Sequence, residues 1–321
     1  MKAAVITRYG SPDVIKILDV PKPTPAADEV LVRVHAATVT RTDCGLLRAH
    51  PFFMRFFTGP LRPSRTILGL DFAGEVEAVG AKTLAFKPGD RVFGMCPSNR
   101  NGAHAEYAAV PERAVATMPA GARFDEAVVC EGAFYAKAAL QSIDLKSGQK
   151  ILIYGASGAI GTALVQLAKA AEAIVTAVVA TPHLELVKTL GADRAVDYTR
   201  EDFTHIGERF DCVVDAVGKT SFFRCRRLLK PDGMFAATDL GAYWQNVVLA
   251  LWSLIARRKR VVIVAPGRIE GFVGFLKGRM EAGKFRAVID REYPLAAIAE
   301  AYRYVETEQK VGIVVINVAA D

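Results

Sequence analysis

Short hydrophobic runs separated by turn residues characterise roughly the first 120 residues of the chain. The runs at residues 29–34, 73–79 and 91–93 are apolar or alternate with polar positions. Gly80 and the Pro-Gly-Asp triplet at 88–90 stand between them. Many short strands joined by turns rich in glycine and proline are typical of a barrel-like β structure. We therefore expect a β-rich unit over this part of the chain.

From about Asp125 the hydrophobic pattern changes to strands that alternate with helices. The expected strands cover residues 151–154, 174–179, 210–217 and 234–238, and the expected helices between them cover 159–171 and 184–190. These strands are almost continuously apolar, which is typical of a parallel sheet buried on both faces. The pattern therefore predicts a doubly wound α/β unit.

After Pro266 the chain again changes character. A glycine-containing helix is expected over 269–282, a second helix over 298–306 and a closing strand over 313–318. The sequence shows no internal repeat.

A glycine-rich loop lies between the first strand and the first helix of the α/β unit. It consists of Gly155, Ala156, Ser157, Gly158, Ala159, Ile160 and Gly161. Glycines allow a tight turn and a close approach of the backbone to a pyrophosphate, and the helix N-terminus offers free N–H groups to it. In this strand–loop–helix context we interpret the loop as a dinucleotide-binding site rather than a structural turn.

The end of the following strand bears on which nicotinamide cofactor is bound. An NAD site uses an acidic residue about twenty residues after the glycines to hold the ribose 2′-OH, but here no carboxylate follows the strand before Glu185. This favours NADPH over NADH, with Thr181, His183 and Arg200 as candidate contacts of the 2′-phosphate. The alternative is that Thr181 caps the next helix and His183 is exposed to solvent.

Composition narrows the class of protein. The 321 residues are 51% hydrophobic, and 41 Lys+Arg against 34 Asp+Glu give a net charge of +7. This excludes a disordered or collagen-like chain, and the small, scattered charge excess is weak evidence for nucleic-acid binding. The five cysteines include no C-x-x-C pair, which favours a reduced, cytoplasmic protein. The longest apolar stretch, at 247–256, has only about ten residues and is too short to cross a membrane. We therefore expect a small-molecule substrate and neither a nucleic-acid nor a membrane partner.

Several motifs together resemble the medium-chain dehydrogenase/reductase superfamily. They lie at residues 69–76, 86–94, 102–107, 154–161, 190–193, 210–215 and 229–233. The branch that the chain resembles most is the zinc-independent quinone oxidoreductases. The resemblance implies a GroES-like β-barrel catalytic domain over 1–120, completed by 266–321. It also implies a Rossmann domain with a doubly wound parallel sheet over 121–265, and a homodimer.

The metal-ligand positions of this superfamily are changed in the chain. At its catalytic zinc, the zinc branch has a Cys at the position of Thr40 and a His at the position of Leu70. Its structural zinc needs four ligands, but the corresponding segment here, residues 91–102, contains only Cys96. We therefore expect no zinc, with Cys44 and Cys96 as small buried side chains. Without a Lewis acid, reduction of a conjugated carbonyl or quinone is easier to support than chemistry that must stabilise an alkoxide.

Candidate catalytic residues follow from the same resemblance. Quinone reductases usually have Asn at the position of Thr40 and often Thr at that of Tyr135, so the chain departs at both. Glu131 and Tyr135 are spaced i, i+4 and share a helix face. One hypothesis is that Tyr135 donates a hydrogen bond to substrate or cofactor while Glu131 orients or charges it; the alternative is an aromatic packing residue beside a solvated acid. Thr40 and Asp43 are further pocket candidates, although Asp43 can equally cap a helix that begins at Cys44.

Two segments and three functions remain open at this stage. The aromatic, basic segment 46–66 either walls a substrate pocket or packs on the barrel, and 246–260 is either an interface helix or a membrane-surface element. We expect an NADPH-dependent oxidoreductase acting on a quinone, an α,β-unsaturated carbonyl or an aldehyde. The alternatives are a zinc-free alcohol/ketone dehydrogenase and a non-catalytic dinucleotide-binding protein with a possible RNA-binding role.

Overall fold

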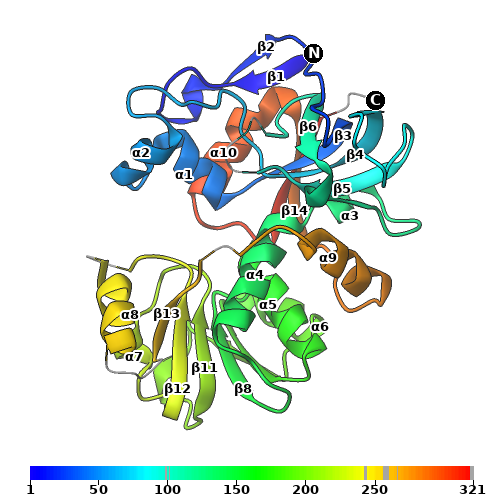
Figure 1. The fold of residues 1–321 in the computed structure, drawn as a ribbon. Coiled ribbons are helices and arrows are strands. Elements are labelled where there is room, and N and C mark those ends of the chain that lie inside the picture. The colour runs from blue at the N-terminus through cyan, green and yellow to red at the C-terminus, as the bar shows by residue number, and fades with distance from the viewer. Residues whose placement is uncertain (98–99, 101, 242–243, 256–259, 266, 319–321) are drawn as a thin grey trace. The chain divides into compact units, whose positions relative to one another are not determined.

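The computed structural model describes all residues except 98–99, 101, 242–243, 256–259, 266 and 319–321, and the chain divides into two compact units (Figure 1). The first contains Met1–Glu131 and Arg268–Asp321, and the second contains Gly132–Gly267. The predicted boundaries were 120/121 and 265/266. The segment 121–131 lies in the first unit because α3 (Phe124–Ala127) contacts strands β3 and β4 there.

The first unit is built mainly on antiparallel strands, with one parallel pair formed by β14 and β15. Its described residues form a seven-stranded sheet in the order β14-β15-β3-β4-β5-β7, with β6 also paired to β3, and a separate β1-β2 pair. The strands are β1 (Lys2–Val5), β2 (Lys16–Asp19), β3 (Glu29–Val39), β4 (Asp71–Val79), β5 (Arg91–Met95), β6 (Tyr107–Pro111), β7 (Val115–Thr117), β14 (Ile289–Pro294) and β15 (Ile313–Asn317). Strand β3 is buried along most of its length, with Val30, Leu31 and Val32 at most 4% exposed.

The C-terminal segment completes this first unit. Strand β15 pairs antiparallel with β3, with Val314 opposite Val39. Helix α10 (Ile298–Glu306) contacts α1, and Figure 1 shows the red-orange helix beside the blue one. The buried residues of α10 are Ile298, Ala301, Tyr302 and Val305, the spacing of an amphipathic helix. The remaining helices of the unit are α1 (Arg41–Arg48), α2 (Arg55–Thr58) and α9 (Phe272–Glu281), with short 3₁₀ turns at Pro12–Val14, Phe52–Met54, Glu112–Ala114 and Leu295–Ala297.

The second unit contains a six-stranded sheet, in which all the recorded pairings are parallel. The strands are β8 (Lys150–Tyr154), β9 (Ile174–Val179), β10 (Arg194–Asp197), β11 (Phe210–Asp215), β12 (Leu229–Ala237) and β13 (Val261–Ile263). The helices are α4 (Cys130–Ser142, which starts in the first unit), α5 (Ala159–Ala170), α6 (Leu184–Thr189), α7 (Phe222–Cys225) and α8 (Gln245–Ile255). Two 3₁₀ turns are η4 (Thr181–His183) and η5 (Phe203–His205).

The order of these strands is β10-β9-β8-β11-β12-β13. This is the 3-2-1-4-5-6 order of doubly wound dinucleotide-binding sheets, in which ligands bind at the carboxyl ends where the order reverses, here between β8 and β11. The fold class expected from the sequence, a GroES-like unit plus a Rossmann sheet, is confirmed.

The structure describes part of the two segments, 46–66 and 246–260, for which the sequence leaves two interpretations each. In the segment 46–66, Leu46 and Leu47 pack into the core of the first unit, as the packing interpretation expects, whereas the rings of Phe56 and Phe57 are exposed. Arg65 is buried and donates to the carbonyl of Arg100. Helix α8 exposes Leu251 and Trp252. The basic residues at 257–259 that follow it lie outside the described residues.

Candidate functional site

The glycine-rich loop connects β8 to α5, where the parallel sheet reverses its order. Gly155 has φ +76°, in the left-handed region that favours glycine. A Cβ atom there would lie 2.5 Å from Val217 Cγ2. A Cβ on Gly161 would lie 2.2 Å from the carbonyl oxygen of Gly155. The chain itself therefore requires glycine at both positions, because the loop, the start of α5 and the loop after β11 approach one another closely.

Gly158 is different, because its own protein surroundings do not require glycine. A Cβ there would meet nothing nearer than 3.8 Å. Gly158 is the N-cap of α5 and has no side chain to bond the first N–H groups of the helix. Those groups lack intrahelical partners, and together with the helix dipole they suit an anion. The loop therefore fits the pyrophosphate of a dinucleotide, whose close approach also accounts for a glycine at this position.

A buried carboxylate shapes the opposite side of this loop. Asp215 ends β11 with no exposed surface, and its oxygens accept hydrogen bonds from the N–H groups of Val217, Gly218 and Thr220 at 3.1, 2.9 and 2.8 Å. These bonds hold the turn that brings Val217 against Gly155. Burial raises the pKa of Asp215, and the backbone donors act against that rise. Sequence reasoning included Asp215 in a motif but assigned it no role.

The ends of β9 and β10 form a second polar cluster in this unit. The hydroxyl of Thr181 donates to Asp197 Oδ2 at 2.5 Å and lies 3.0 Å from that of Thr199. Thr181 is therefore not a helix cap; the N-caps of η4 and α6 are Ala180 and His183. Arg200 Nε lies 3.9 Å from Asp197 Oδ2. The sequence pattern did not single out Asp197, because this acid ends β10 and comes beside the end of β9 only through strand pairing.

In the first unit, Thr40 and Asp43 form the start of helix α1. The helix begins at Arg41, not at Cys44, so the expectation that Asp43 caps a helix from Cys44 is wrong. Thr40 is the N-cap: its hydroxyl donates to Asp43 Oδ2 at 2.8 Å, and it accepts from the Asp43 N–H at 3.1 Å. Asp43 Oδ1 also accepts from the N–H of Gly69 at 3.1 Å. Thr40 thus has its hydroxyl proton bonded within the protein, and its side chain is buried.

A pair of buried acids, Asp71 and Glu131, lies where α4 begins. Asp71 accepts from the N–H of Glu131 at 2.8 and 3.0 Å and from the hydroxyl of Thr38 at 3.2 Å. Glu131 Oε1 in turn accepts from the hydroxyl of Thr42 at 2.6 Å. Glu131 is only 5% exposed, so the alternative of a solvated acid is wrong. Burial raises the pKa of Glu131, with the Thr42 hydrogen bond opposing it, and burial raises that of Asp71 well above its usual range.

A histidine extends this network into the β core. His104 is buried, with Nε2 2.8 Å from the carbonyl of Thr38 and Nδ1 3.3 Å from the hydroxyl of Tyr302. Because a carbonyl only accepts, Nε2 carries the proton and Nδ1 accepts from Tyr302. Burial lowers the pKa of His104, which keeps the ring neutral. Polar contacts therefore run without interruption from Tyr302 through Thr38 and Asp71 to Glu131.

Tyr135 lies one turn after Glu131 on α4, as the i, i+4 spacing predicts. Its side chain is half-buried, and its ring meets that of Phe134 edge-on at 6.3 Å.

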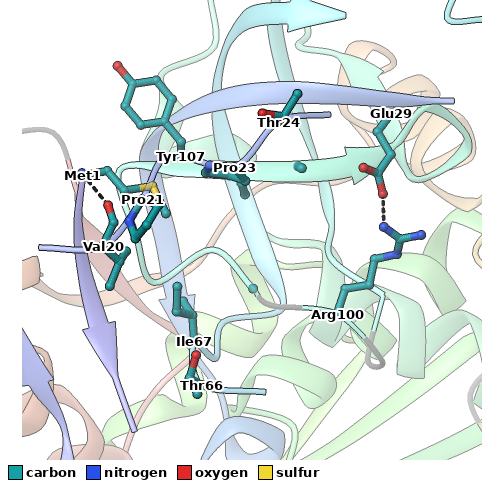
Figure 2. A pocket seen from close by; sticks show the side chains of 13 residues that line it. Met1, Val20, Pro21, Pro23, Thr24, Glu29, Thr66, Ile67, Arg100 and Tyr107 are labelled. Carbon is teal, nitrogen blue, oxygen red and sulfur yellow. Dashed lines mark hydrogen bonds and ion pairs between the residues drawn. The ribbon is translucent and has the colours of Figure 1, made fainter. Parts of the chain in front are cut away.

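A cavity of about 570 Å³ lies elsewhere in the first unit. Figure 2 shows Pro21, Ile67 and Tyr107 at its wall, with the buried carboxylate of Glu29 paired to Arg100. It includes none of the predicted site residues. Since its buried charge is already paired, nothing there points to reaction chemistry.

Comparison with known proteins places the chain in a family. Residues 26–120 match the model of the alcohol dehydrogenase GroES-like domain, and residues 190–316 match that of zinc-binding dehydrogenases. The chain is 33% identical to 2-methylene-furan-3-one reductase of Solanum lycopersicum, covering 99% of this chain and 79% of that protein. It is 30% identical to NADPH-dependent alkenal/one oxidoreductase of Arabidopsis thaliana, covering 98% and 79%.

The chain belongs to the medium-chain dehydrogenase/reductase superfamily, in its quinone oxidoreductase-like branch. The fold agrees: the quinone oxidoreductase of Coxiella burnetii superposes with a TM-score of 0.88 at 24% identity over 99% of both chains.

The described residues of this dehydrogenase/reductase contain neither a metal-binding cluster nor a membrane-spanning helix. Among them, no group of three or more His, Cys, Asp or Glu side chains is arranged to hold a metal ion. Across the same residues, no helix combines the length and the apolar character needed to cross a membrane. All five cysteines are buried as free thiols.

The glycine loop yields a matched pair of variants. Gly161→Ala places a methyl group against backbone, so we expect a loss of about 1–3 kcal/mol in the free energy of unfolding. Gly158→Ala meets no protein atom closely, so its melting temperature should stay that of the wild type while its Kd for the dinucleotide rises. Thermal unfolding and calorimetric titration measure the two effects. A Gly158→Ala protein that binds as tightly as the wild type would contradict the proposed approach of the pyrophosphate.

The buried carboxyl of Asp71 yields a pH-dependent difference in stability. A raised pKa means that the folded state binds more protons than the unfolded state above the ordinary value of 3.8. In the wild type, the contribution of Asp71 to the free energy of unfolding therefore decreases as the pH rises from 3.8 towards the folded-state pKa. Asp71→Asn has no titrating carboxyl at this position and does not lose this contribution. The free energy of unfolding of the variant minus that of the wild type should therefore increase by about 1.4 kcal/mol per pH unit in this range.

Urea unfolding of both proteins between pH 4 and 8 measures this difference. The exposed acid variant Asp19→Asn is the control, because Asp19 is 78% exposed. A difference between Asp71→Asn and wild type that stays constant with pH would show that the carboxyl titrates normally.

Proposed function

We propose that this chain is a zinc-independent, NADPH-dependent oxidoreductase that transfers hydride to a quinone or an α,β-unsaturated carbonyl compound. The observation that carries the proposal is the Gly155–Gly161 loop, which opens α5 where the parallel sheet reverses its order. Membership of the quinone oxidoreductase-like branch supports the reaction class, and two of its relatives are named as a furanone reductase and an alkenal/one oxidoreductase.

The choice of NADPH rests on the end of β9. No acid follows that strand directly, and Arg200 is the cationic candidate for a 2′-phosphate contact, with Thr181 and His183 as further polar candidates. The name of the Arabidopsis relative includes NADPH dependence. Asp197 acts against this preference, but its two oxygens accept from Thr181 and Thr199.

Zinc independence rests on the chemistry of the side chains at the superfamily's ligand positions. Leu70 is a buried alkyl chain that has no electron pair to give. Thr40 offers a hydroxyl, and that hydroxyl is bonded to Asp43 as the cap of α1. Neither residue resembles the thiolate and imidazole donors that zinc prefers.

The residues of the chain would then supply hydrogen bonding and a proton. When bound, NADPH supplies a hydride to an electron-poor carbon of the substrate. The hydroxyl of Tyr135 would donate a hydrogen bond to the substrate oxygen as negative charge develops on it. Burial raises the pKa of Glu131, one helical turn earlier, and so favours its protonated form. The proton that completes the reduction would come from Glu131, and the Thr42 hydroxyl fixes one of its oxygens.

We also propose a cytoplasmic homodimer formed through the nucleotide-binding unit, without a nucleic-acid or membrane partner. Among the described residues, β13 is the last strand of the parallel sheet, and α8, which contacts β13, exposes the side chains of Leu251 and Trp252. Burial of these apolar side chains against a second copy would be favourable.

A substrate panel tests the function directly. We expect NADPH oxidation with quinones and enals, slower reaction with saturated ketones and no change after treatment with a chelator. Absorbance at the nicotinamide band measures turnover, and elemental analysis measures zinc. Tight NADPH binding without oxidation of any acceptor would instead favour the non-catalytic binding protein, and preferential oxidation of alcohols would favour the dehydrogenase. Stoichiometric zinc would contradict zinc independence.

Tyr135→Phe tests the hydroxyl assigned to the substrate oxygen. We expect kcat to fall about tenfold to a hundredfold, because the developing charge loses a donor, while the Kd for NADPH stays unchanged. Tyr304→Phe is the control, since that hydroxyl donates to Asp290 and has no assigned role in the reaction.

Glu131→Gln tests the proton donor in the same assay. A donor must be protonated, so wild-type activity should decline as pH rises through the raised pKa of Glu131. The Gln variant should be slow and lack that decline. Undiminished turnover in the folded Tyr135→Phe protein would remove that residue from the mechanism, and an unchanged pH profile in Glu131→Gln would remove Glu131.

A further inference from the structure

The carboxylate of Asp197 is enclosed by donors from its own loop and from the neighbouring strand end. Its side chain is 8% exposed. The hydroxyl of Thr181 bonds one oxygen at 2.5 Å, and the N–H and hydroxyl of Thr199 bond the other at 2.9 and 2.6 Å. In the parallel register Asp197 stands beside Val179, the last residue of β9. This is the strand end at which the adenosine ribose lies in a sheet of this order.

The hydrogen bonds fix the direction of both hydroxyl groups. Hydrogen bonds from Thr181 and then Thr199 lower the pKa of Asp197, so it is ionised at neutral pH and only accepts. Each threonine has one hydroxyl proton, and both protons point at the carboxylate. Thr181 is an exposed residue, and its hydroxyl therefore offers lone pairs, not a proton, to a ligand that binds beside it.

We propose that Asp197 is the residue that limits this enzyme's preference for NADPH over NADH. It orients Thr181 as an acceptor, which suits the donating 2′-OH of NADH. It also adds a negative charge at the strand end where the 2′-phosphate of NADPH would bind. The inference rests on the proposed nicotinamide-dependent function and assigns the residue that controls selection between its two cofactors.

The other charged groups around this strand end modulate the effect but do not cancel it. Arg200 lies 3.9 Å from Asp197, and 77% of its side chain is exposed. His183 ends η4 and is half-buried, while Glu185 and Glu201 are exposed. Among these acids, Asp197 is the one bonded to Thr181. We therefore expect the wild-type protein to bind both cofactors, with Arg200 supporting the 2′-phosphate.

Asp197→Asn removes the charge and also reverses a hydrogen bond. The Asn amide can donate to Thr181 Oγ1, which frees the Thr181 proton to donate to a phosphate oxygen. A phosphate monoester carries about −1.5 to −2 charges at neutral pH. Coulomb repulsion through water between Asp197 and such a phosphate would be of a size that changes the affinity about tenfold, so we expect a change of this order when the charge is removed.

Titration of the pure protein with NADP⁺ and with NAD⁺, followed by calorimetry, tests the proposal without relying on turnover. For Asp197→Asn we expect the ratio of Kd(NAD⁺) to Kd(NADP⁺) to rise about tenfold. Thr181→Val should weaken NAD⁺ binding more than NADP⁺ binding, which provides a second variant if Asp197→Asn does not fold. Glu201→Gln removes an exposed acid four residues further on and should leave the ratio unchanged.

The outcomes separate this inference from the proposed function. Equal changes in both affinities for Asp197→Asn, or the same shift in Glu201→Gln, would overturn the role of Asp197. A wild-type protein that binds neither nucleotide would overturn the proposed function as well. A protein that binds both nucleotides but reduces no acceptor would leave the selection mechanism intact and remove only the reductase activity.

Discussion

A carboxylate that is removed from water must be surrounded by hydrogen-bond donors, and this requirement holds the loops of both units in place. Asp43, Asp71 and Asp215 are at most 1% exposed. Each bonds backbone N–H groups of a neighbouring segment: Gly69 for Asp43, Glu131 for Asp71, and the turn after β11 for Asp215. Replacing any of them with an apolar residue would leave buried donors unpaired, so these acids act as fixed points around which the site is built.

The two polar clusters differ in electrostatic character, and the difference matches their proposed roles. Around Asp71 and Glu131, burial is the dominant influence and raises both pKa values. Such an environment keeps a proton available. At the ends of β9 and β10 the hydrogen bonds dominate and lower the pKa of Asp197. A permanently charged carboxylate there is suited to select between a hydroxyl and a phosphate group.

Local pattern was sufficient for much of the architecture. The expected strand 174–179 and the expected helix 298–306 coincide with β9 and α10, because continuous apolar runs and i, i+3, i+4 spacing record burial directly. The start of α1 was misplaced by three residues, since both Thr40 and Asp43 are good capping residues and only their reciprocal bonds show which one is the N-cap.

In the candidate site, too, the local features were predictable from the sequence and the contacts between distant segments were not. The phosphate loop is encoded locally: its glycines, the strand before it and the helix after it are adjacent in the chain, so the residue pattern alone specified them. The burial of Glu131 and the approach of Asp197 to Thr181 depend on segments separated by 60 and 16 positions, which join through Asp71 and across neighbouring strand ends. Composition and periodicity carry no information about such pairings, because strand order and register are properties of the folded sheet. Whether a carboxyl is solvated, protonated or charged is therefore decided only when those strands pack.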